Sequence, residues 1–169
     1  MELVLANKND LANVQEMFTN IIKNMYAQNI KIWDEYYPNE VFMSDIDNKN
    51  LYLLKEGDEI LGAFSLYEHI DIEQDVEWQD KNAKAYLLNR VGVNVNYLQK
   101  GIGQKLVKMA KDIAKEKKGE YLRLLVCEVN TPAINLYKKC KLKKVKGIHE
   151  EKIEKDYSLN EYGFEVLLT

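Results

Sequence analysis

The sequence predicts a mixed α/β protein, of the α/β (α+β mixed sheet) class, in which helices flank a central mixed β-sheet. Apolar residues recur at helical spacing in residues 11–25 and again in residues 102–113. Short apolar runs that are typical of strands occur at residues 51–54, 60–66, 85–93 and 121–126. With 169 residues, 46% of them hydrophobic, the chain can bury a substantial core, and we expect a single domain over residues 1–169.

The first third of the chain predicts two helices and a hairpin. The elements are, in order, a strand at residues 2–6, a helix to about residue 29, a loop at residues 30–38, a short helix at residues 40–46 and two strands at residues 51–54 and 60–66. Asn9 or Asp10 can cap the first helix. Pro38 ends the aromatic loop, and the turn at residues 56–59 joins the two strands into a hairpin.

Residues 70–78 alternate between apolar and acidic side chains, a period that indicates a strand or flap with one acidic face. That face could attract a cationic substrate, or it could be an ordinary solvated sheet face.

The second half predicts a strand–loop–helix unit followed by further strands. The elements are a strand at residues 85–93, a long helix from residue 102 to about residue 118, a strand at residues 121–126, a short helix, a strand at residues 142–148, a charged connection at residues 149–163 and a last strand at residues 164–168. We expect Gly119 to cap the long helix. Thr131 is the expected N-cap of the short helix, with Pro132 in its first turn.

Charge and composition exclude several classes of protein. The formal net charge of −3 argues against a nucleic-acid-binding protein, which usually carries a basic surplus. Cys127 and Cys140 do not form a C-x-x-C pair, and a reduced cytoplasmic setting is expected. The N-terminus lacks the layout of a signal peptide, and no apolar run approaches the ~20 residues of a membrane span.

A glycine-bearing loop, Gly101-Ile102-Gly103, stands between the central apolar strand and the long helix. Glycines at such a turn let the backbone approach a ligand, and the first N–H groups of the helix stay unpaired. These groups favour an anion, most often a phosphate. A dinucleotide-binding loop is excluded because Leu106 takes the place of its third glycine, and no G-x-x-x-x-G-K-[ST] loop is present.

Three blocks of the chain fit one known family. The first is Arg90-Val91-Gly92-Val93, Tyr97 and residues 100–106; the second is residues 124–137, with Asn130 and an A-x-x-x-Y pattern that ends at Tyr137; the third is residues 140–145. Together they resemble the Gcn5-related N-acetyltransferase (GNAT) superfamily, whose acetyl-CoA motif is [QR]-x-x-G-x-[GA]. The chain departs from that pattern at Leu98, the first motif position, and at Lys141-Leu142, where a Gly-Phe pair is frequent.

The resemblance implies the GNAT fold and acetyl-CoA as the co-substrate. It implies that the backbone around Val91 and Val93 pairs with the pantetheine arm as an added strand would. Asn130 would hydrogen-bond the pantetheine or the following helix, and Tyr137 would sit beside the thioester sulfur. The pyrophosphate would be held by the backbone N–H groups of Gln99, Lys100, Gly101, Ile102, Gly103 and Gln104.

Tyr137 is the predicted catalytic residue. A tyrosine has a reference pKa of about 10 and a thiol one of about 8.5, so a phenol holds a proton that it can donate to the departing CoA thiolate. The alternative is a core tyrosine on an apolar helix face, since the chain has 11 tyrosines.

The acceptor half of the reaction is less specific in the sequence. Candidates for the base are Glu68, His69, Glu77 and Asp80, and no spacing singles one out. The aromatic residues Trp33, Tyr36, Tyr37 and Tyr67 could wall an acceptor pocket through cation–π contacts or pack at the edge of the core. Cys127 follows an apolar strand, where a cysteine is commonly buried and inert, and no His/Cys cluster has metal-ligand spacing, so no metal is predicted.

The sequence therefore predicts an acetyl-CoA-dependent N-acetyltransferase that acetylates a primary amine, on a small molecule or a peptide, by direct attack. Two alternatives stay open: a non-catalytic acyl-CoA-binding sensor or partner protein, and a transferase for a longer acyl group. No nucleic-acid or membrane partner is expected, and pairing along the edge of the last strand allows a homodimer.

Overall fold

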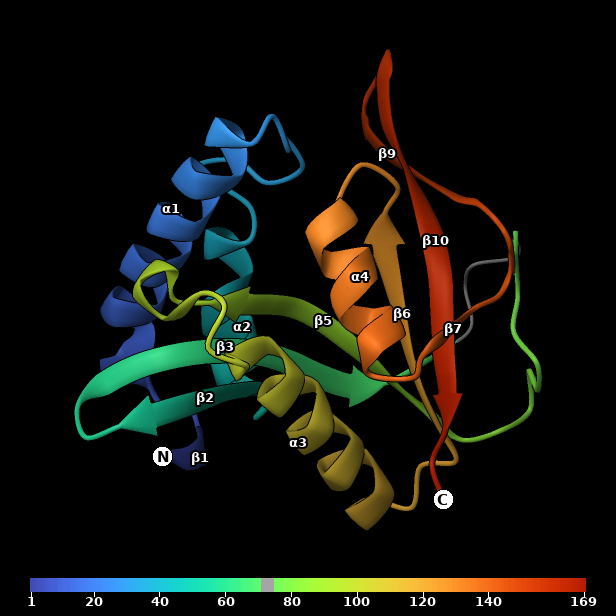
Figure 1. Ribbon diagram of the computed structural model, residues 1–169, viewed down its shortest axis with the longest axis horizontal. Coiled ribbons are helices and arrows are strands. Elements are labelled where there is room, and N and C mark those ends of the chain that lie inside the picture. The colour runs from blue at the N-terminus through green and yellow to red at the C-terminus, as the bar shows by residue number, and fades with distance from the viewer. Residues whose placement is uncertain (71–74) are drawn as a thin grey trace. The chain divides into compact units, whose positions relative to one another are not determined.

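The computed structural model describes residues 1–70 and 75–169. In these residues, eight strands form a mixed sheet in the order β1-β2-β3-β5-β6-β10-β7, with β9 paired to β10 (Figure 1). The pair β5–β6 is parallel, whereas β10 runs antiparallel to β6. Together with four α-helices, this sheet confirms the predicted fold class.

The chain divides into two compact units, which we describe separately. Unit 1 comprises Met1–Leu66 and Asn89–Leu106, and unit 2 comprises Tyr67–Leu88 and Val107–Thr169. Strands β3 and β5 and helix α3 each contribute residues to both units. The single domain over residues 1–169 stays a prediction.

Unit 1 contains the N-terminal helices and the hairpin. Its elements are β1 (Glu2–Leu5), η1 (Lys8–Asp10), α1 (Leu11–Ala27), η2 (Asn39–Val41), α2 (Phe42–Asp47), β2 (Leu51–Glu56), β3 (Glu59–Glu68), the end of β5 (Ala85–Val93), η3 (Val95–Tyr97) and the start of α3 (Ile102–Glu116). Strands β1, β2 and β3 pair antiparallel. Phe18 of α1 is fully buried, and its ring lies 4.7 Å from that of Phe42 and 5.7 Å from that of Trp33. Burial of this apolar face of α1 therefore anchors α1 and α2 in the core of the unit.

Helix α1 is preceded by a capping box that lies earlier than predicted. Asp10 stands at the N-cap of α1, as one of the two predicted candidates, but its side chain makes no cap hydrogen bond to that helix. Asn7 instead caps η1: its side chain accepts the backbone N–H of Asn9 at 2.9 Å, and the Asp10 carboxylate accepts the backbone N–H of Asn7 at 2.9 Å. The Asp10 carboxylate also accepts Lys55 Nζ at 2.7 Å. The difference arises because a 3₁₀ turn precedes α1, which moves the first unpaired N–H groups toward the N-terminus.

The Asp10 carboxylate should make the stability of the protein sensitive to acid. Partial burial raises its pKa, but the hydrogen bonds from Lys55 and the Asn7 backbone outweigh that effect, and the pKa is lowered below its usual 3.8. A carboxyl whose pKa is depressed on folding stabilises the protein above its unfolded pKa, and that contribution is lost as pH falls through the folded pKa. Asp10→Asn should therefore destabilise the protein at pH 7 and flatten its loss of stability below about pH 4. Urea unfolding at pH 3 to 7 measures both effects, and an unchanged slope in that acid range would contradict the role of Asp10.

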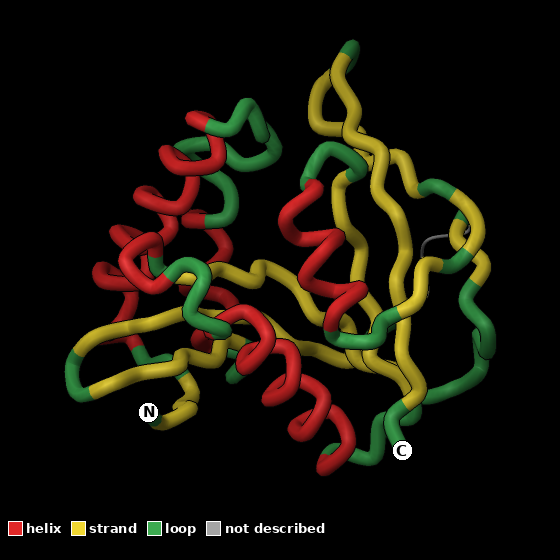
Figure 2. The backbone as a smooth tube through the Cα atoms, viewed as in Figure 1, coloured by secondary structure: helices red, strands yellow, loops and turns green. Residues whose placement is uncertain are grey.

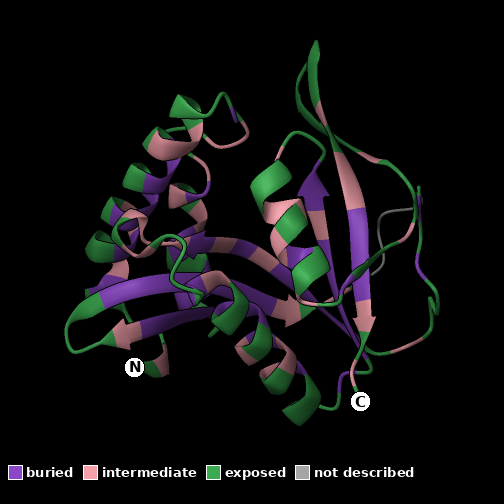
Figure 3. Ribbon diagram, viewed as in Figure 1, coloured by how far each residue is buried: buried purple, intermediate pink, exposed green. Residues whose placement is uncertain are grey.

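Unit 2 is organised around its last strand. Its elements are β4 (Val76–Glu77), β6 (Tyr121–Cys127), α4 (Thr131–Lys139), β7 (Lys143–Lys144), β8 (Lys146–Gly147), β9 (His149–Glu154) and β10 (Tyr157–Leu167), together with the remaining parts of β3, β5 and α3. Strand β10 pairs with β6, β7 and β9. Figure 3 shows β6 buried along nearly its whole length, whereas β9 is exposed.

Two predictions for the C-terminal part were wrong. Residues 142–148 form the two short strands β7 and β8 instead of one strand. Residues 149–163, predicted as a charged connection, form β9 and most of β10, a long hairpin (Figure 2). Their charged side chains are exposed, so the hairpin leaves no apolar pattern in the sequence, and its strands are fixed by backbone pairing in the register Glu161↔His149.

The alternating segment at residues 70–78 is described in part. Residues 71–74 lie outside the described residues. Val76 and Trp78 are buried while Glu77 between them is exposed, and Val76–Glu77 pairs with Lys146–Gly147. The predicted alternation therefore holds at these three positions.

Helix α3 ends at Glu116, three residues before the predicted cap. Lys118, with φ of 64°, adopts the left-handed conformation, and the backbone N–H of Gly119 donates to the Ala114 carbonyl at 2.8 Å. Gly119 is nevertheless required, because a Cβ there would lie 2.7 Å from the ring of Tyr86. Among the described residues, no helix is both long and apolar enough to cross a membrane.

Candidate functional site

The last four residues of β5 alternate between buried and half-buried positions within unit 1. Arg90 and Gly92 are buried, whereas Val91 and Val93 are half-buried. Gly92 is needed for packing, because a Cβ there would lie 2.6 Å from the Phe18 ring and 2.9 Å from Ile21. The parallel register that the structure gives between β5 and β6 covers Ala85 to Leu87, so both valines lie beyond it.

The predicted phosphate loop links β5 to α3 in unit 1 (Figure 2). Gln99 and Gly101 both adopt the left-handed conformation, with φ of 60° and 77°, and both are exposed. Helix α3 begins at Ile102, and the first N–H group with a backbone acceptor is that of Lys105, which donates to the Gly101 carbonyl at 3.1 Å. Within the described residues, the backbone N–H groups of residues 99–104 have no such acceptor. The loop therefore offers the free donors that an anion at a helix start requires.

Two lysines stand beside this loop. Lys100 Nζ donates to the Asn96 carbonyl at 3.3 Å and lies 4.9 Å from the centre of the Tyr97 ring. Lys105 Nζ contacts Met1 Sδ at 3.3 Å. Both lysines are exposed, so their positive charges add to the attraction of the loop for an anion.

The two left-handed residues of the loop lead to opposite expectations on substitution. Gly101→Ala should lower the free energy of unfolding by about 1–2 kcal/mol, because alanine disfavours a φ of 77°, although a Cβ there would meet no atom within 4 Å. The change should also weaken acetyl-CoA binding if the loop is the phosphate site. Gln99→Gly is the matched control, since glycine adopts the same conformation freely. Urea unfolding and calorimetric titration of acetyl-CoA test both variants. Equal affinity for all three proteins would show that the loop conformation does not matter for binding.

Asn130 lies in unit 2 and is the N-cap of α4, in place of the predicted Thr131. Its Oδ1 accepts the backbone N–H of Ala133 at 3.4 Å, and its carbonyl accepts that of Ile134 at 3.0 Å. Thr131 is instead the first helical residue. Asn130 was predicted to hydrogen-bond either the pantetheine or the following helix, and in the structure it bonds to the helix.

Tyr137 lies on α4 in unit 2 and is buried, with 8% of its surface exposed. Burial raises its pKa, and the charge of Cys140 acts in the same direction. The phenol therefore keeps its proton throughout the neutral range. The residue can act as a proton donor toward a group that becomes strongly basic.

Cys127 is a poor candidate for a covalent nucleophile. The residue is buried and free, and burial raises its pKa more than the hydrogen bonds from the Val129 and Glu128 backbone lower it. The nearby charge of Glu161 raises the pKa further. A thiol in this environment stays protonated at neutral pH and is unreactive.

The structure does not single out one of the predicted acceptor-side residues. In unit 2, His69 packs edge-on against Trp78 at 5.4 Å, and the exposed Asp80 carboxylate accepts the backbone N–H of Asn82. In unit 1, Trp33 packs on the core whereas Tyr36 is exposed. The assignment of the base to Glu68, His69, Glu77 or Asp80 stays a prediction.

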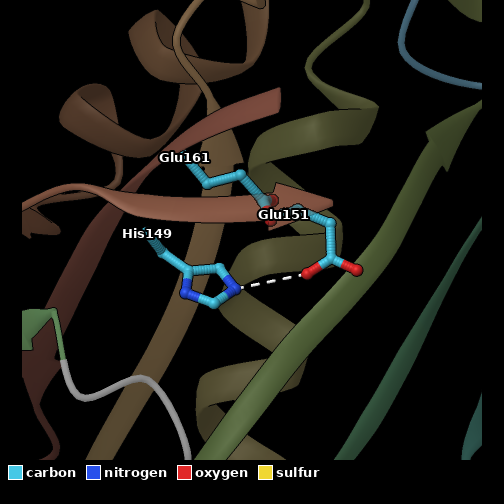
Figure 4. Close-up of side chains that lie close together, drawn as sticks. All are labelled: His149, Glu151 and Glu161. Atoms are coloured by element: carbon cyan, nitrogen blue, oxygen red, sulfur yellow. Dashed lines mark hydrogen bonds and ion pairs between the residues drawn. The ribbon is translucent and has the colours of Figure 1, made fainter. Parts of the chain in front are cut away.

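Three ionisable groups come together in unit 2 without a signal in the sequence. His149 Nε2 lies 3.2 Å from a carboxylate oxygen of Glu151, and Glu161 faces His149 across the β9–β10 ladder (Figure 4). The three ligand atoms lie within 4.8 Å of one another, a spacing that a metal ion could span. These three residues are brought together by the pairing of β9 with β10, which the sequence did not predict. The absence of a metal stays a prediction.

Sequence reasoning also missed two buried ion pairs. Arg90 pairs with Asp45 in unit 1, and Arg123 pairs with Glu165 in unit 2. The partners are far apart in the sequence, and charged residues are rarely buried unless paired. Neither pair could therefore be recognised before the fold was known.

Solved structures of acetyltransferases share this fold. A GNAT-family acetyltransferase from Streptococcus agalactiae has a TM-score of 0.75 at 16% identity, over 98% of this chain and 94% of its own. A ribosomal-protein-alanine N-acetyltransferase from Brucella melitensis has a TM-score of 0.73 at 18% identity, over 99% of this chain and 100% of its own. An acetyltransferase structure from Salmonella typhimurium, which contains acetyl-CoA as its cofactor, has a TM-score of 0.69 at 14% identity, over 99% of this chain and 94% of its own.

The sequence itself matches a known family. None of the curated proteins matches the chain. The profile of the acetyltransferase (GNAT) family, however, matches residues 16–141, about three quarters of the chain, which include β5, the glycine loop, Asn130 and Tyr137. The resemblance seen in the sequence is thus confirmed. The chain belongs to the acetyltransferase (GNAT) family.

Proposed function

We propose that this protein is an acetyl-CoA-dependent N-acetyltransferase that acetylates a primary amine by direct attack on the thioester. The observation that carries the proposal is the loop at the start of α3. Gln99 and Gly101 turn its backbone into the left-handed conformation, and the N–H groups of residues 99–104 have no backbone acceptor among the described residues. A pyrophosphate would satisfy these donors, and membership of the GNAT family makes coenzyme A the expected carrier of that pyrophosphate.

The binding roles follow from this assignment. The backbone of Val91 and Val93, which lie beyond the residues of β5 that pair with β6, would bind the pantetheine arm by strand addition. The backbone of Gln99, Lys100, Gly101, Ile102, Gly103 and Gln104 would hold the pyrophosphate, with Lys100 and Lys105 adding positive charge. Asn130 would support the site by fixing the start of the helix that carries Tyr137.

The chemistry requires one proton donor and one proton acceptor. Acetyl-CoA supplies an acetyl thioester, whose C–S bond breaks as the amine nitrogen bonds to the carbonyl carbon. The phenol of Tyr137 gives its proton to the sulfur, so that CoA leaves as a neutral thiol, and the nitrogen loses a proton to a base. General-acid catalysis of this kind is typically worth about 10²–10⁴ in rate. Burial raises the pKa of Tyr137, so its phenol is protonated at neutral pH.

An amine panel tests the proposed function. The protein is incubated with acetyl-CoA and, separately, with polyamines, aminoglycosides, amino acids and peptides. An alanine-ended peptide is included because one protein of similar fold is named as a ribosomal-protein-alanine N-acetyltransferase. We expect amine-dependent release of CoA together with an acetylated product. Tight binding of acetyl-CoA with no product from any amine would favour a non-catalytic sensor, and tighter binding of a longer acyl-CoA would favour a different acyl group.

A further inference from the structure

Arg90 holds an unfavourable backbone conformation inside a strand of unit 1. Its φ is 50°, in the left-handed region that residues with a Cβ avoid. The residue immediately precedes Val91, in the part of β5 to which the pantetheine arm is assigned. Strain of this kind persists only where the surrounding structure over-determines it.

The side chain of Arg90 is held by a buried carboxylate. Arg90 Nε donates to Asp45 Oδ2 at 2.8 Å, and Arg90 Nη2 donates to Asp45 Oδ1 at 2.9 Å. The two residues are 8% and 7% exposed, so this bidentate pair is almost fully shielded from water. Such a pair fixes the guanidinium in both position and orientation.

Further hydrogen bonds connect this pair to two other segments of unit 1. Ser65 of β3, which is completely buried, donates its hydroxyl to Asp45 Oδ2 at 2.6 Å and accepts Arg90 Nε at 3.3 Å. Arg90 Nη1 donates to the Tyr37 hydroxyl at 3.3 Å. We call Arg90, Asp45 and Ser65 the Arg90 clamp. It ties β5 to β3, to α2 and to the segment that precedes α2.

We propose that the Arg90 clamp holds the left-handed turn of β5 and so presents Val91 and Val93 to acetyl-CoA, which makes Arg90 a positioning residue. This inference rests on the proposed function. Side chains and backbone groups alternate along a strand, so a local turn decides which way the following N–H and C=O groups point. Without the clamp, a residue with a Cβ at position 90 returns to extended backbone, and the two valines lose their orientation.

Two double variants separate this role from ordinary stabilisation. Both carry Asp45→Leu, which removes the buried carboxylate, and they differ in carrying Arg90→Met or Arg90→Gly. The methionine variant replaces the ion pair by apolar packing and should be the more stable of the two. Glycine adopts a φ of 50° freely, so the glycine variant should be less stable yet keep the turn. We expect the methionine variant to bind acetyl-CoA about tenfold more weakly than the wild type, and the glycine variant to bind about fivefold more tightly than the methionine variant.

The matched control is a second ion pair of unit 1, between Lys55 and Asp10, whose side chains are 24% and 9% exposed. Asp10→Leu/Lys55→Met should lower stability without changing the affinity for acetyl-CoA, as measured by calorimetric titration. Affinities that follow stability, with the methionine variant the tighter binder, would overturn the inference.

Hydrogen exchange distinguishes failure of this inference from failure of the proposed function. The amides of Val91 and Val93 should exchange faster in the methionine variant than in the glycine variant, whether or not acetyl-CoA binds. If the wild type does not bind acetyl-CoA but the two variants still differ in exchange, the proposed function alone is overturned. Equal exchange in both variants would overturn the Arg90 clamp.

Discussion

Tyr137→Phe should lower the rate of amine-dependent CoA release by about 10²–10³-fold while leaving acetyl-CoA binding unchanged. The substitution removes one hydroxyl from a buried ring on α4 and so deletes the proton donor with little change in packing. Without that donor, CoA must leave as a thiolate. Steady-state kinetics give kcat, and calorimetric titration gives the affinity for acetyl-CoA.

Tyr162→Phe is the control for this substitution. Tyr162 belongs to the same unit, and its hydroxyl donates to Glu128 at 3.4 Å on the exposed side of β10. Its loss should leave kcat within about twofold of wild type, as for most surface changes. If Tyr137→Phe also retains full kcat, then Tyr137 is a core residue and another group protonates the leaving thiolate.

Glu165→Leu should lower the free energy of unfolding by about 3–5 kcal/mol, the largest stability effect that we expect in unit 2. Glu165 accepts Arg123 Nε at 3.1 Å and the backbone N–H of Gln79 at 2.8 Å, and the two charged side chains are 5% and 1% exposed. Arg123 also donates to the Asp80 carbonyl at 2.5 Å and stacks over the Trp78 ring at 5.0 Å. Removal of the carboxylate leaves a buried guanidinium without its counter-charge.

The double variant Arg123→Met/Glu165→Leu tests this explanation. Replacement of a buried ion pair by apolar residues is often neutral or stabilising, so the second substitution should recover most of the lost stability. Urea unfolding of the wild type, both single variants and the double variant gives the coupling energy. Additive losses would contradict the pairing of the two charges.

The parts of the fold with a strong apolar pattern could be predicted from the sequence. Helices α1 and α3 and strands β5 and β6 bury continuous stripes or runs, and the loop at Gly101 lies where the sequence indicated. The predictions of the helix caps were less accurate. Asp10 holds the N-cap position of α1 without a side-chain bond to it, Asn7 caps the 3₁₀ turn before α1, and Asn130 caps α4 in place of Thr131. Several polar side chains stand near each helix start, and the cap depends on where the backbone turns.

The features that depend on distant pairing could not be predicted. Strand β9 and the first half of β10 carry exposed charged residues, and only their mutual register brings His149 and Glu161 together. Arg90 and Arg123 lie within predicted strands, but their carboxylate partners are 45 and 42 residues away, and only the fold brings each pair together. Local sequence carries no signal for such pairs.

A single-turnover experiment tests the central claim, direct transfer of the acetyl group from acetyl-CoA to an amine, most directly. Excess protein is mixed with acetyl-CoA labelled in its acetyl group and with an amine found in the panel, and the reaction is quenched at intervals. Direct transfer predicts that acetylated amine and CoA appear together in equal amounts, and that intact-protein mass spectrometry shows no acetylated protein at any time. Transient acetylation of the protein, at Cys127 for example, would contradict direct transfer.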